Sequence, residues 1–254
     1  MRLKILGCSG GVGGALRTTS MLLDNDILID AGTGVGDLSI EEMSAIDHIF
    51  VTHSHLDHIA FIPLMIDTVI GLREKHITVH ATRETWQILK EHIFNWKVWP
   101  DFSVIPDTVD PILRYSEIRV GQAVDLGGRR ITPLPVNHVV PAVGFQLDSG
   151  AASLVFSGDT TVCDAFWAAV NRISNLRYLL IETAFGNGEF KLAQLSKHLC
   201  PAMLHEELGK LALSAQIFIT HLKPGEGDQI MRQIGESEFP LRPVRLQAGQ
   251  VFDF

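Results

Sequence analysis

The stretch Thr52–His58 reads THSHLDH, directly after the apolar run Ile49–Val51 and directly before a helical pattern. We therefore expect it in a strand-to-helix loop, a kind of loop that often carries chemistry. Three histidines and one aspartate within six residues favour metal binding, although a lone histidine is more often a hydrogen-bonded or solvated residue than a ligand. Alternation lets His53 and His55 point to one side, while Asp57 and His58 lie a turn further on and can face a second ion.

The ligand types in this stretch indicate which metal it would take. Imidazole and carboxylate groups with no nearby thiolate suit zinc, and each ion would keep a position open for water or substrate. A histidine at position 55, where an iron site would favour a carboxylate, favours zinc further. We therefore predict two Zn²⁺ ions, with Mn²⁺ or Fe²⁺ as alternatives.

Three later strand-like runs also lead into residues that can bind metals. The runs 131–136, 153–156 and 217–219 are each followed closely by such a residue, namely His138, Asp159 and His221. Any one of these residues taken alone would more readily be structural. Their repeated placement after strands predicts that they join the histidine-rich loop in one site.

The remaining pattern predicts a chain of strands interrupted by helices. Predicted strands cover Leu3–Leu6, Ser20–Leu23, Ile27–Asp30, His48–Thr52, Ile118–Val120, Ile131–Leu134, Val143–Leu147, Ser153–Phe156, Leu176–Ile181 and Gln216–Thr220. Predicted helices cover Ile59–Leu72, Arg83–Trp96, Cys163–Ile173 and Pro201–Leu213. We expect an α/β (α+β) fold of two sheets covered by helices. Because no linker or low-complexity tract interrupts the pattern, we expect a single domain over residues 1–254.

Composition narrows the classes of partner and location. Hydrophobic residues make up 46% and charged residues 20% of the 254 residues, which predicts a large buried core. The formal net charge of −8 is the wrong sign for gripping a nucleic-acid backbone, so nucleic-acid partners are not expected. Three distant cysteines predict no disulfide framework. No run approaches the ~20 apolar residues of a membrane span, and no signal peptide is predicted. We expect a cytoplasmic protein without membrane association.

The order of these motifs resembles the metallo-β-lactamase superfamily, and the likeness covers nearly the whole chain. The resemblance implies an αββα sandwich of two mixed β-sheets. It also implies a ligand set in which Asp159 bridges two ions. The first ion would be held by His53, His55 and His138, and the second by Asp57, His58 and His221. By the same resemblance, Asp30 in the Leu-Ile-Asp-Ala-Gly segment supports the histidine loop.

Two smaller segments resemble class II cyclic-nucleotide phosphodiesterases within that superfamily. These are residues 180–187, LIETAFGN, and residues 196–202, SKHLCPA. The chain departs from the family pattern at Lys197 and Cys200, where glycine and threonine are usual. Similar segments in transfer-RNA 3′-end endonucleases imply that His198 protonates the leaving group while Glu182 orients its ring.

The resemblance implies hydrolysis of a small phosphodiester, most nearly 3′,5′-cyclic AMP, to a 5′-mononucleotide. Asp57 would also orient the attacking water. Alternatives are an RNA-processing endonuclease like the transfer-RNA 3′-end enzymes, a thioesterase or other metallo-hydrolase of this fold, and a non-catalytic metal-binding protein. A shared aspartate such as Asp159 argues against a lactamase, and the complete ligand set argues against a non-catalytic protein.

The segment Trp86–Phe102 carries three tryptophans and could cover the pocket. Aromatic residues at helical spacing more often pack in a core or in a homodimer interface. We therefore expect packing, and a homodimer stays open as an oligomeric state.

Overall fold

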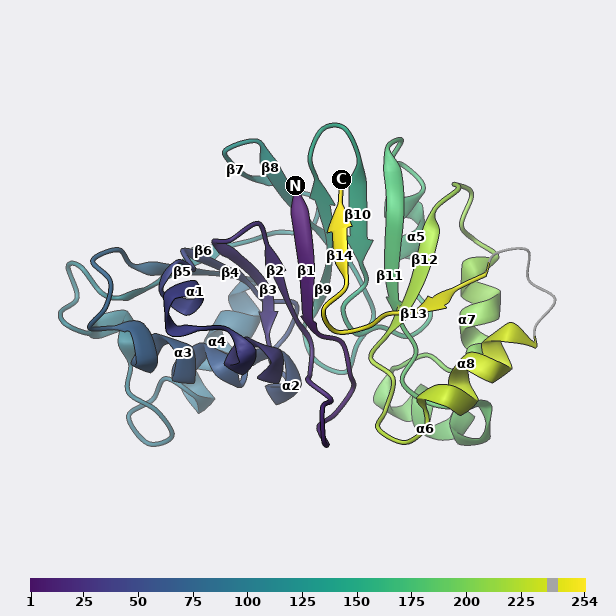
Figure 1. The fold of residues 1–254 in the computed structure, drawn as a ribbon, viewed down its shortest axis with the longest axis horizontal. Helices are drawn as coiled ribbons and strands as arrows, with labels where there is room; N and C mark the ends of the chain where they lie inside the picture. The colour runs from purple at the N-terminus through teal and green to yellow at the C-terminus, as the bar shows by residue number, and fades with distance from the viewer. Residues whose placement is uncertain (237–241) are drawn as a thin grey trace.

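The computed structural model describes residues 1–236 and 242–254, which form two seven-stranded sheets (Figure 1). The strands of the first sheet are β1 (Arg2–Gly7), β2 (Ser20–Leu23), β3 (Ile27–Ala31), β4 (His48–Phe50), β5 (Ile77–Ala81), β6 (Leu113–Glu117) and β14 (Val251–Asp253). They follow the order β14-β1-β2-β3-β4-β5-β6. Pairing is antiparallel from β14 to β3 and parallel from β3 to β6.

The second sheet has the same mixed character. Its strands are β7 (Val124–Leu126), β8 (Arg129–Pro135), β9 (Val143–Asp148), β10 (Ser153–Phe156), β11 (Leu176–Glu182), β12 (Gln216–Thr220) and β13 (Val244–Arg245). They follow the order β13-β12-β11-β10-β9-β8-β7. Pairing is antiparallel from β7 to β10 and parallel from β10 to β13.

Helices flank both sheets, one group on each side of Figure 1. Beside the first sheet lie α1 (Ile40–Ser44), α2 (Leu56–Ile59), α3 (Phe61–Val69) and α4 (Arg83–His92), and beside the second lie α5 (Asp164–Val170), α6 (Phe190–Ser196), α7 (Pro201–Leu208) and α8 (Gly227–Gly235). The αββα sandwich of two mixed sheets is therefore the fold, as the sequence predicts. None of the helices in the described ranges is long and apolar enough to cross a bilayer.

The core explains why several strands are apolar on both faces. Successive side chains of a strand point to opposite faces of the sheet. In β3, Ile27 and Ile29 belong to the cluster between the sheets, while Leu28 packs in the cluster beneath the helices. Phe50 and Ile49 of β4 divide in the same way. Strands buried on both faces read as continuous apolar runs, which is the signal that the sequence carries here.

Several predicted element bounds are wrong. The predicted strand Ile118–Val120 does not form, because β6 ends at Glu117 and a turn with φ of 80° at Gly121 follows. The predicted helix Ile59–Leu72 begins earlier and is split into α2 and α3. Asp57 and His58 therefore lie within α2 and not in the preceding loop.

The other three predicted helices are shorter than the apolar periodicity indicates. Helix α4 ends at His92, four residues before Trp96, whose φ of 63° is not helical. Helix α7 ends at Leu208 with Gly209 as its C-cap, and α5 spans only Asp164–Val170. The predicted domain of 1–254 also includes 237–241, which lie outside the described residues.

Candidate metal centre

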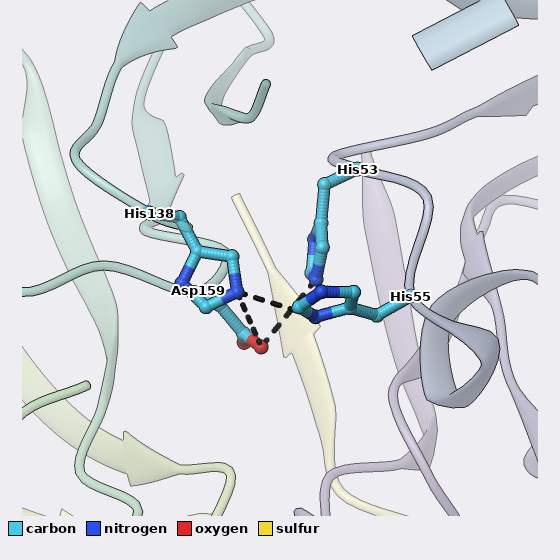
Figure 2. Close-up of side chains that lie close together, drawn as sticks. All are labelled: His53, His55, His138 and Asp159. Atoms are coloured by element: carbon cyan, nitrogen blue, oxygen red, sulfur yellow. Dashed lines mark hydrogen bonds and ion pairs between the residues drawn. The ribbon is translucent and has the colours of Figure 1, made fainter. Parts of the chain in front are cut away.

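Four side chains predicted to hold one ion converge in Figure 2, and these are His53, His55, His138 and Asp159. His53 Nε2 lies 3.6 Å from Asp159 Oδ2. His138 Nε2 lies 4.0 Å from the same oxygen and 3.3 Å from His55 Nδ1. Because zinc–ligand bonds are about 2.0–2.2 Å long, donor atoms with this spacing can surround one ion.

A second group of donors lies on the other side of Asp159. It consists of Asp57, His58, Asp159 and His221. His58 Nε2 lies 3.4 Å and His221 Nδ1 3.2 Å from Asp159 Oδ1, and His221 Nε2 lies 3.7 Å from Asp57 Oδ2. The two oxygens of Asp159 thus face two different groups of donors.

The ends of strands from both sheets bring these groups together. His53 follows β4, His138 follows β8, Asp159 follows β10 and His221 follows β12. His55 is the N-cap of α2. Asp57 and His58 lie within this single-turn helix, and their side chains reach the same place as the residues at the strand ends. All seven residues predicted as ligands from the sequence therefore meet at one place.

Buried donor atoms test whether a metal fits this place. In the described part of the chain, His53 Nε2, His58 Nε2 and His221 Nδ1 are buried without a hydrogen-bond partner. Such atoms are costly unless something else satisfies them, and a divalent cation is a group that can do so. The donor set fits a divalent metal.

The charge state of most ligands fits as well. His58 is the exception: burial alone would lower its pKa, but the Asp159 and Asp30 carboxylates raise it well above its usual range, so a metal bound there would displace a proton. Burial lowers the pKa of His53 well below its usual range and that of His221 to about 3, which keeps both imidazoles neutral. Burial alone would raise the pKa of Asp159, but interactions with the adjacent His221 and His58 rings hold it well below its usual range. Neutral imidazole and ionised carboxylate are the forms that bind metals.

Asp30 is hydrogen-bonded to the first and last residues of the histidine-rich segment, Thr52 and His58. Its Oδ1 accepts a hydrogen bond from Thr52 N at 2.8 Å, and its Oδ2 accepts from Thr52 Oγ1 at 2.8 Å and lies 2.7 Å from His58 Nδ1. Asp30 is fully buried. A carboxylate on the far ring nitrogen of a histidine orients its other nitrogen, so Asp30 supports the loop as the resemblance implies. The supporting role of Thr52 was not predicted from the sequence. The only sequence signal for it is that Thr52 directly precedes His53.

His138 is oriented through the backbone of residue 197. His138 Nδ1 lies 3.1 Å from the carbonyl oxygen of Lys197, to which it can donate. Lys197 ends α6 in a left-handed conformation, with φ of 53° and ψ of 50°. Its Nζ donates to Asn137 Oδ1 and to the His138 carbonyl, both at 3.1 Å. Lys197 thus keeps the left-handed backbone that glycine favours, and its side chain also holds the His138 loop.

A buried Glu182–His198 pair lies beside Asp159. Glu182 Oε1 is 2.7 Å from His198 Nδ1 and accepts from Thr160 N at 3.0 Å, while Oε2 accepts from Leu199 N at 3.3 Å. Asp159, Glu182 and His198 offer ligand atoms within 4.8 Å of one another. Burial alone would lower the pKa of His198, but the Glu182 carboxylate raises it above its ordinary value. The His198 ring therefore holds a proton more readily than a free imidazole.

The His198 ring also lies against the proposed ligands of both ions. Its centroid is 5.1 Å from that of His138 and 5.2 Å from that of His221, with the latter rings stacked at 20°. This position places the His198 ring next to both groups of donors.

The aromatic segment after β5 serves mainly as packing. Trp86 stacks on Tyr115 with centroids 4.8 Å apart at 5°, and Phe94 and Phe102 are buried in the core beneath the helices. Trp96 differs, since 64% of it is exposed. Most aromatic side chains of the segment therefore pack against the protein core, as their helical spacing predicts.

Comparison with known proteins places this geometry in a family. The family model described as "Beta-lactamase superfamily domain" matches residues 25–238. The chain belongs to this superfamily. Divalent-metal binding is implied by its fold, and the cluster of histidines and aspartates described above agrees with it.

Two of the curated relatives with named activities are each similar to part of the chain. A "Probable 3′,5′-cyclic-nucleotide phosphodiesterase" of Yersinia pestis is 25% identical over 217 residues, covering 75% of this chain and 61% of the relative. A "Ribonuclease Z" of Haloarcula marismortui is 33% identical over 156 residues, covering 58% of this chain and 47% of the relative. The aligned regions thus span less than two thirds of either relative.

Among solved structures, unliganded yeast PDE1 has a similar fold. It superposes with a TM-score of 0.82 at 18% identity and covers 98% of each chain. This likeness supports the superfamily fold alone.

Proposed function

We propose that this superfamily member is a two-metal phosphodiesterase that hydrolyses a 3′,5′-cyclic nucleotide, cyclic AMP first among them, to a 5′-mononucleotide. The observation that carries the proposal is Asp159, whose two oxygens face two donor groups beside the Glu182–His198 pair. Similarity to the Yersinia pestis protein supports the choice of substrate.

In the proposed centre, zinc would be held by two groups of ligands with Asp159 shared. The first group is His53, His55 and His138, and the second is Asp57, His58 and His221. Bound divalent ions would lower the pKa of a water ligand and neutralise the phosphoryl oxygens of the substrate. Imidazole and carboxylate donors without a thiolate favour zinc.

The chain's own groups would supply the proton for the leaving oxygen. Water attacks phosphorus, the bond from phosphorus to the 3′ oxygen breaks, and that oxygen needs a proton. His198 is suited to donate it, because Glu182 holds its Nδ1 at 2.7 Å and raises its pKa. Glu182 would orient the ring, as a carboxylate does for a catalytic histidine elsewhere. Asp57, at the edge of the second group and partly exposed, would orient the attacking water.

The test is an assay of metal-loaded protein against cyclic AMP, bis(p-nitrophenyl) phosphate and a precursor transfer RNA, with bound metals counted. Turnover of cyclic AMP in preference to the other two supports the proposal. Activity on the generic diester alone removes the substrate assignment, and absence of turnover with two ions bound overturns the phosphodiesterase role.

Two variants separate the proposed roles. His198→Ala is expected to lower kcat by about 10²–10⁴-fold, the contribution typical of a general acid, with two ions still bound. Glu182→Gln should lower kcat less, because the histidine remains. Unchanged kcat in His198→Ala with normal metal content contradicts the role of His198.

The 33% identity to a ribonuclease Z favours RNA processing as a second candidate. A net charge of −8 counts against it, because RNA binding gains from a positive surface. Cleavage of the precursor transfer RNA in the same assay would promote this second candidate over the first.

A further inference from the structure

A basic cavity lies outside the metal centre, between the loop that follows β1, the loop that follows β12, and the end of β13 with the segment that follows it. Its volume is about 320 Å³, and its walls include Arg17, Lys223 and Arg245 together with Ser9 and Leu222. Figure 1 shows the loop after β1 descending at the centre of the molecule, between the two groups of helices. The three cationic side chains come from three separate parts of the chain.

The cavity concentrates positive charge in an acidic protein. Three of its lining residues are cationic, and none of the described residues that line it is acidic, whereas the whole chain carries −8. Like charges repel, so such a concentration costs free energy unless anions offset it. Asp37 and Asp228 offset two of the three charges, but both lie outside the cavity lining and are exposed.

Each cation retains the capacity to bind an anion. Lys223 Nζ donates to Gly10 O at 2.8 Å, and no carboxylate of the described residues pairs with it, so two of its N–H donors stay available. Arg17 Nε pairs with Asp37 at 2.9 Å, and its Nη1 donates to the Gly14 and Leu16 carbonyls at 3.2 Å and 3.3 Å. Arg245 pairs with Asp228 at 2.7 Å. These carboxylates are 54% and 91% exposed. Exposed ion pairs contribute little, so a phosphate can compete for both guanidinium groups.

The rest of the wall is apolar and indicates an organic group beside the anion. Leu16, Leu222, Pro224 and Leu246 line the cavity together with Ala15 and Ala248. Small-molecule sites combine such surfaces with a few polar groups and have volumes from about 300 Å³ upward. A nucleoside monophosphate matches both the charge and this size.

We propose that the basic cavity binds the phosphate group of a small phosphorylated molecule, at a site separate from the metal ligands. Cys8 O accepts from His221 N at 2.8 Å, and Ser9 Oγ donates to Leu222 O at 3.3 Å. Residues that line the cavity are therefore hydrogen-bonded to the segment that carries His221. The proposal does not depend on the proposed phosphodiesterase activity, because it concerns binding without turnover.

Isothermal titration of the metal-loaded protein with inorganic phosphate, 5′-AMP and adenosine tests the proposal. Lys223→Gln and Arg245→Gln should each weaken binding of 5′-AMP by about tenfold, the effect of losing one charged hydrogen bond. Metal content and melting temperature are measured for each variant. Lys191→Gln, the same charge change at an exposed position on α6, should bind as the wild type does.

The three probes distinguish the source of the phosphate. Only the binding that Lys223→Gln and Arg245→Gln weaken belongs to the cavity. For that binding, a higher affinity for 5′-AMP than for inorganic phosphate identifies a nucleotide-like ligand, and equal affinity identifies free phosphate. Because Lys223 also lies over the Phe185 ring, 5.8 Å from its centroid, its loss could disturb folding, so Arg17→Gln provides an independent variant. The proposal is overturned if adenosine binds as well as 5′-AMP, or if folded variants bind both phosphates as the wild type does.

Discussion

Replacing Asp30 with asparagine tests whether the residue behind the histidine-rich segment controls metal binding. Asp30 is fully buried, and its two oxygens serve Thr52 N, Thr52 Oγ1 and His58 Nδ1 at 2.7–2.8 Å. Asparagine has nearly the same shape but offers one acceptor oxygen, and its NH₂ group faces donors. At least one of the three hydrogen bonds is therefore lost, or two if the NH₂ group takes the place of Oδ2, and at least one buried donor is left without a partner.

The magnitude follows from that lost bond. A buried donor left unpaired costs about 1–3 kcal/mol, so the free energy of unfolding of metal-free protein should fall by that amount. His58 also loses the carboxylate that orients its ring. Removing such a support lowers metal affinity by about 10–100-fold, and we expect that loss for the ion bound by His58.

Urea denaturation of metal-free protein and competitive titration with a zinc chelator measure the two effects separately. Asp67→Asn, an exposed position on α3, is the matched control and should change neither. Lower stability with unchanged metal affinity would reduce Asp30 to a purely structural residue. If neither quantity changed, the hydrogen bonds described for Asp30 would not explain its burial.

Three further predictions concern stability. Chelation of bound metal should lower the melting temperature, because a ligand present at 1,000 times its Kd adds about 4 kcal/mol to the free energy of unfolding. An unchanged melting temperature would contradict the conclusion that the donor set fits a divalent metal. Cys200→Thr should raise the free energy of unfolding by roughly 0.5–1 kcal/mol. Cys200 is the N-cap of α7, and its own side chain makes no capping hydrogen bond, while Asn187 Oδ1 already accepts from Ala202 N at 2.8 Å. A threonine hydroxyl would therefore serve the N–H of Met203, and urea titration measures the gain. Burial would raise the pKa of Asp101, but its bonds to Lys90 and Ser103 lower it overall. Its contribution is thus present above the unfolded pKa of about 3.9 and is lost as the pH falls through the lower folded pKa. The stability gap between wild type and Asp101→Asn should therefore narrow from pH 7 to pH 3.

The parts of the fold that burial dictates were predictable from the sequence. Strands such as β3 and β11 are apolar on both faces, because one face of each sheet packs against the other sheet and the opposite face packs against helices. A strand buried in this way reads as a continuous apolar run. Short edge strands such as β7 and β13 carry no such run, since β13 spans only Val244–Arg245. Their existence depends on pairing with a neighbour that sequence periodicity does not reveal. The single domain over 1–254 stays a prediction.

The residues of the candidate site that contribute side-chain donor atoms were predictable from the sequence. All seven residues predicted as ligands have functional atoms that face the same place, and they follow strand ends or begin a helix. The roles of Thr52 and of the Lys197 carbonyl were not predictable. Threonine before a histidine is common, and a backbone carbonyl has no signature in the residue type that carries it.

Lys197 shows how a motif can change while the site keeps its geometry. What His138 needs from this position is a carbonyl oxygen at 3.1 Å, and a left-handed backbone provides it. A non-glycine residue in that conformation costs roughly 1–2 kcal/mol. Two hydrogen bonds from the lysine ammonium to Asn137 and His138 contribute about 0.5–1.5 kcal/mol each and can offset that cost. Lys197→Gly should therefore keep the carbonyl in place but release the His138 loop, whereas Lys197→Ala would lose both bonds and retain the strain.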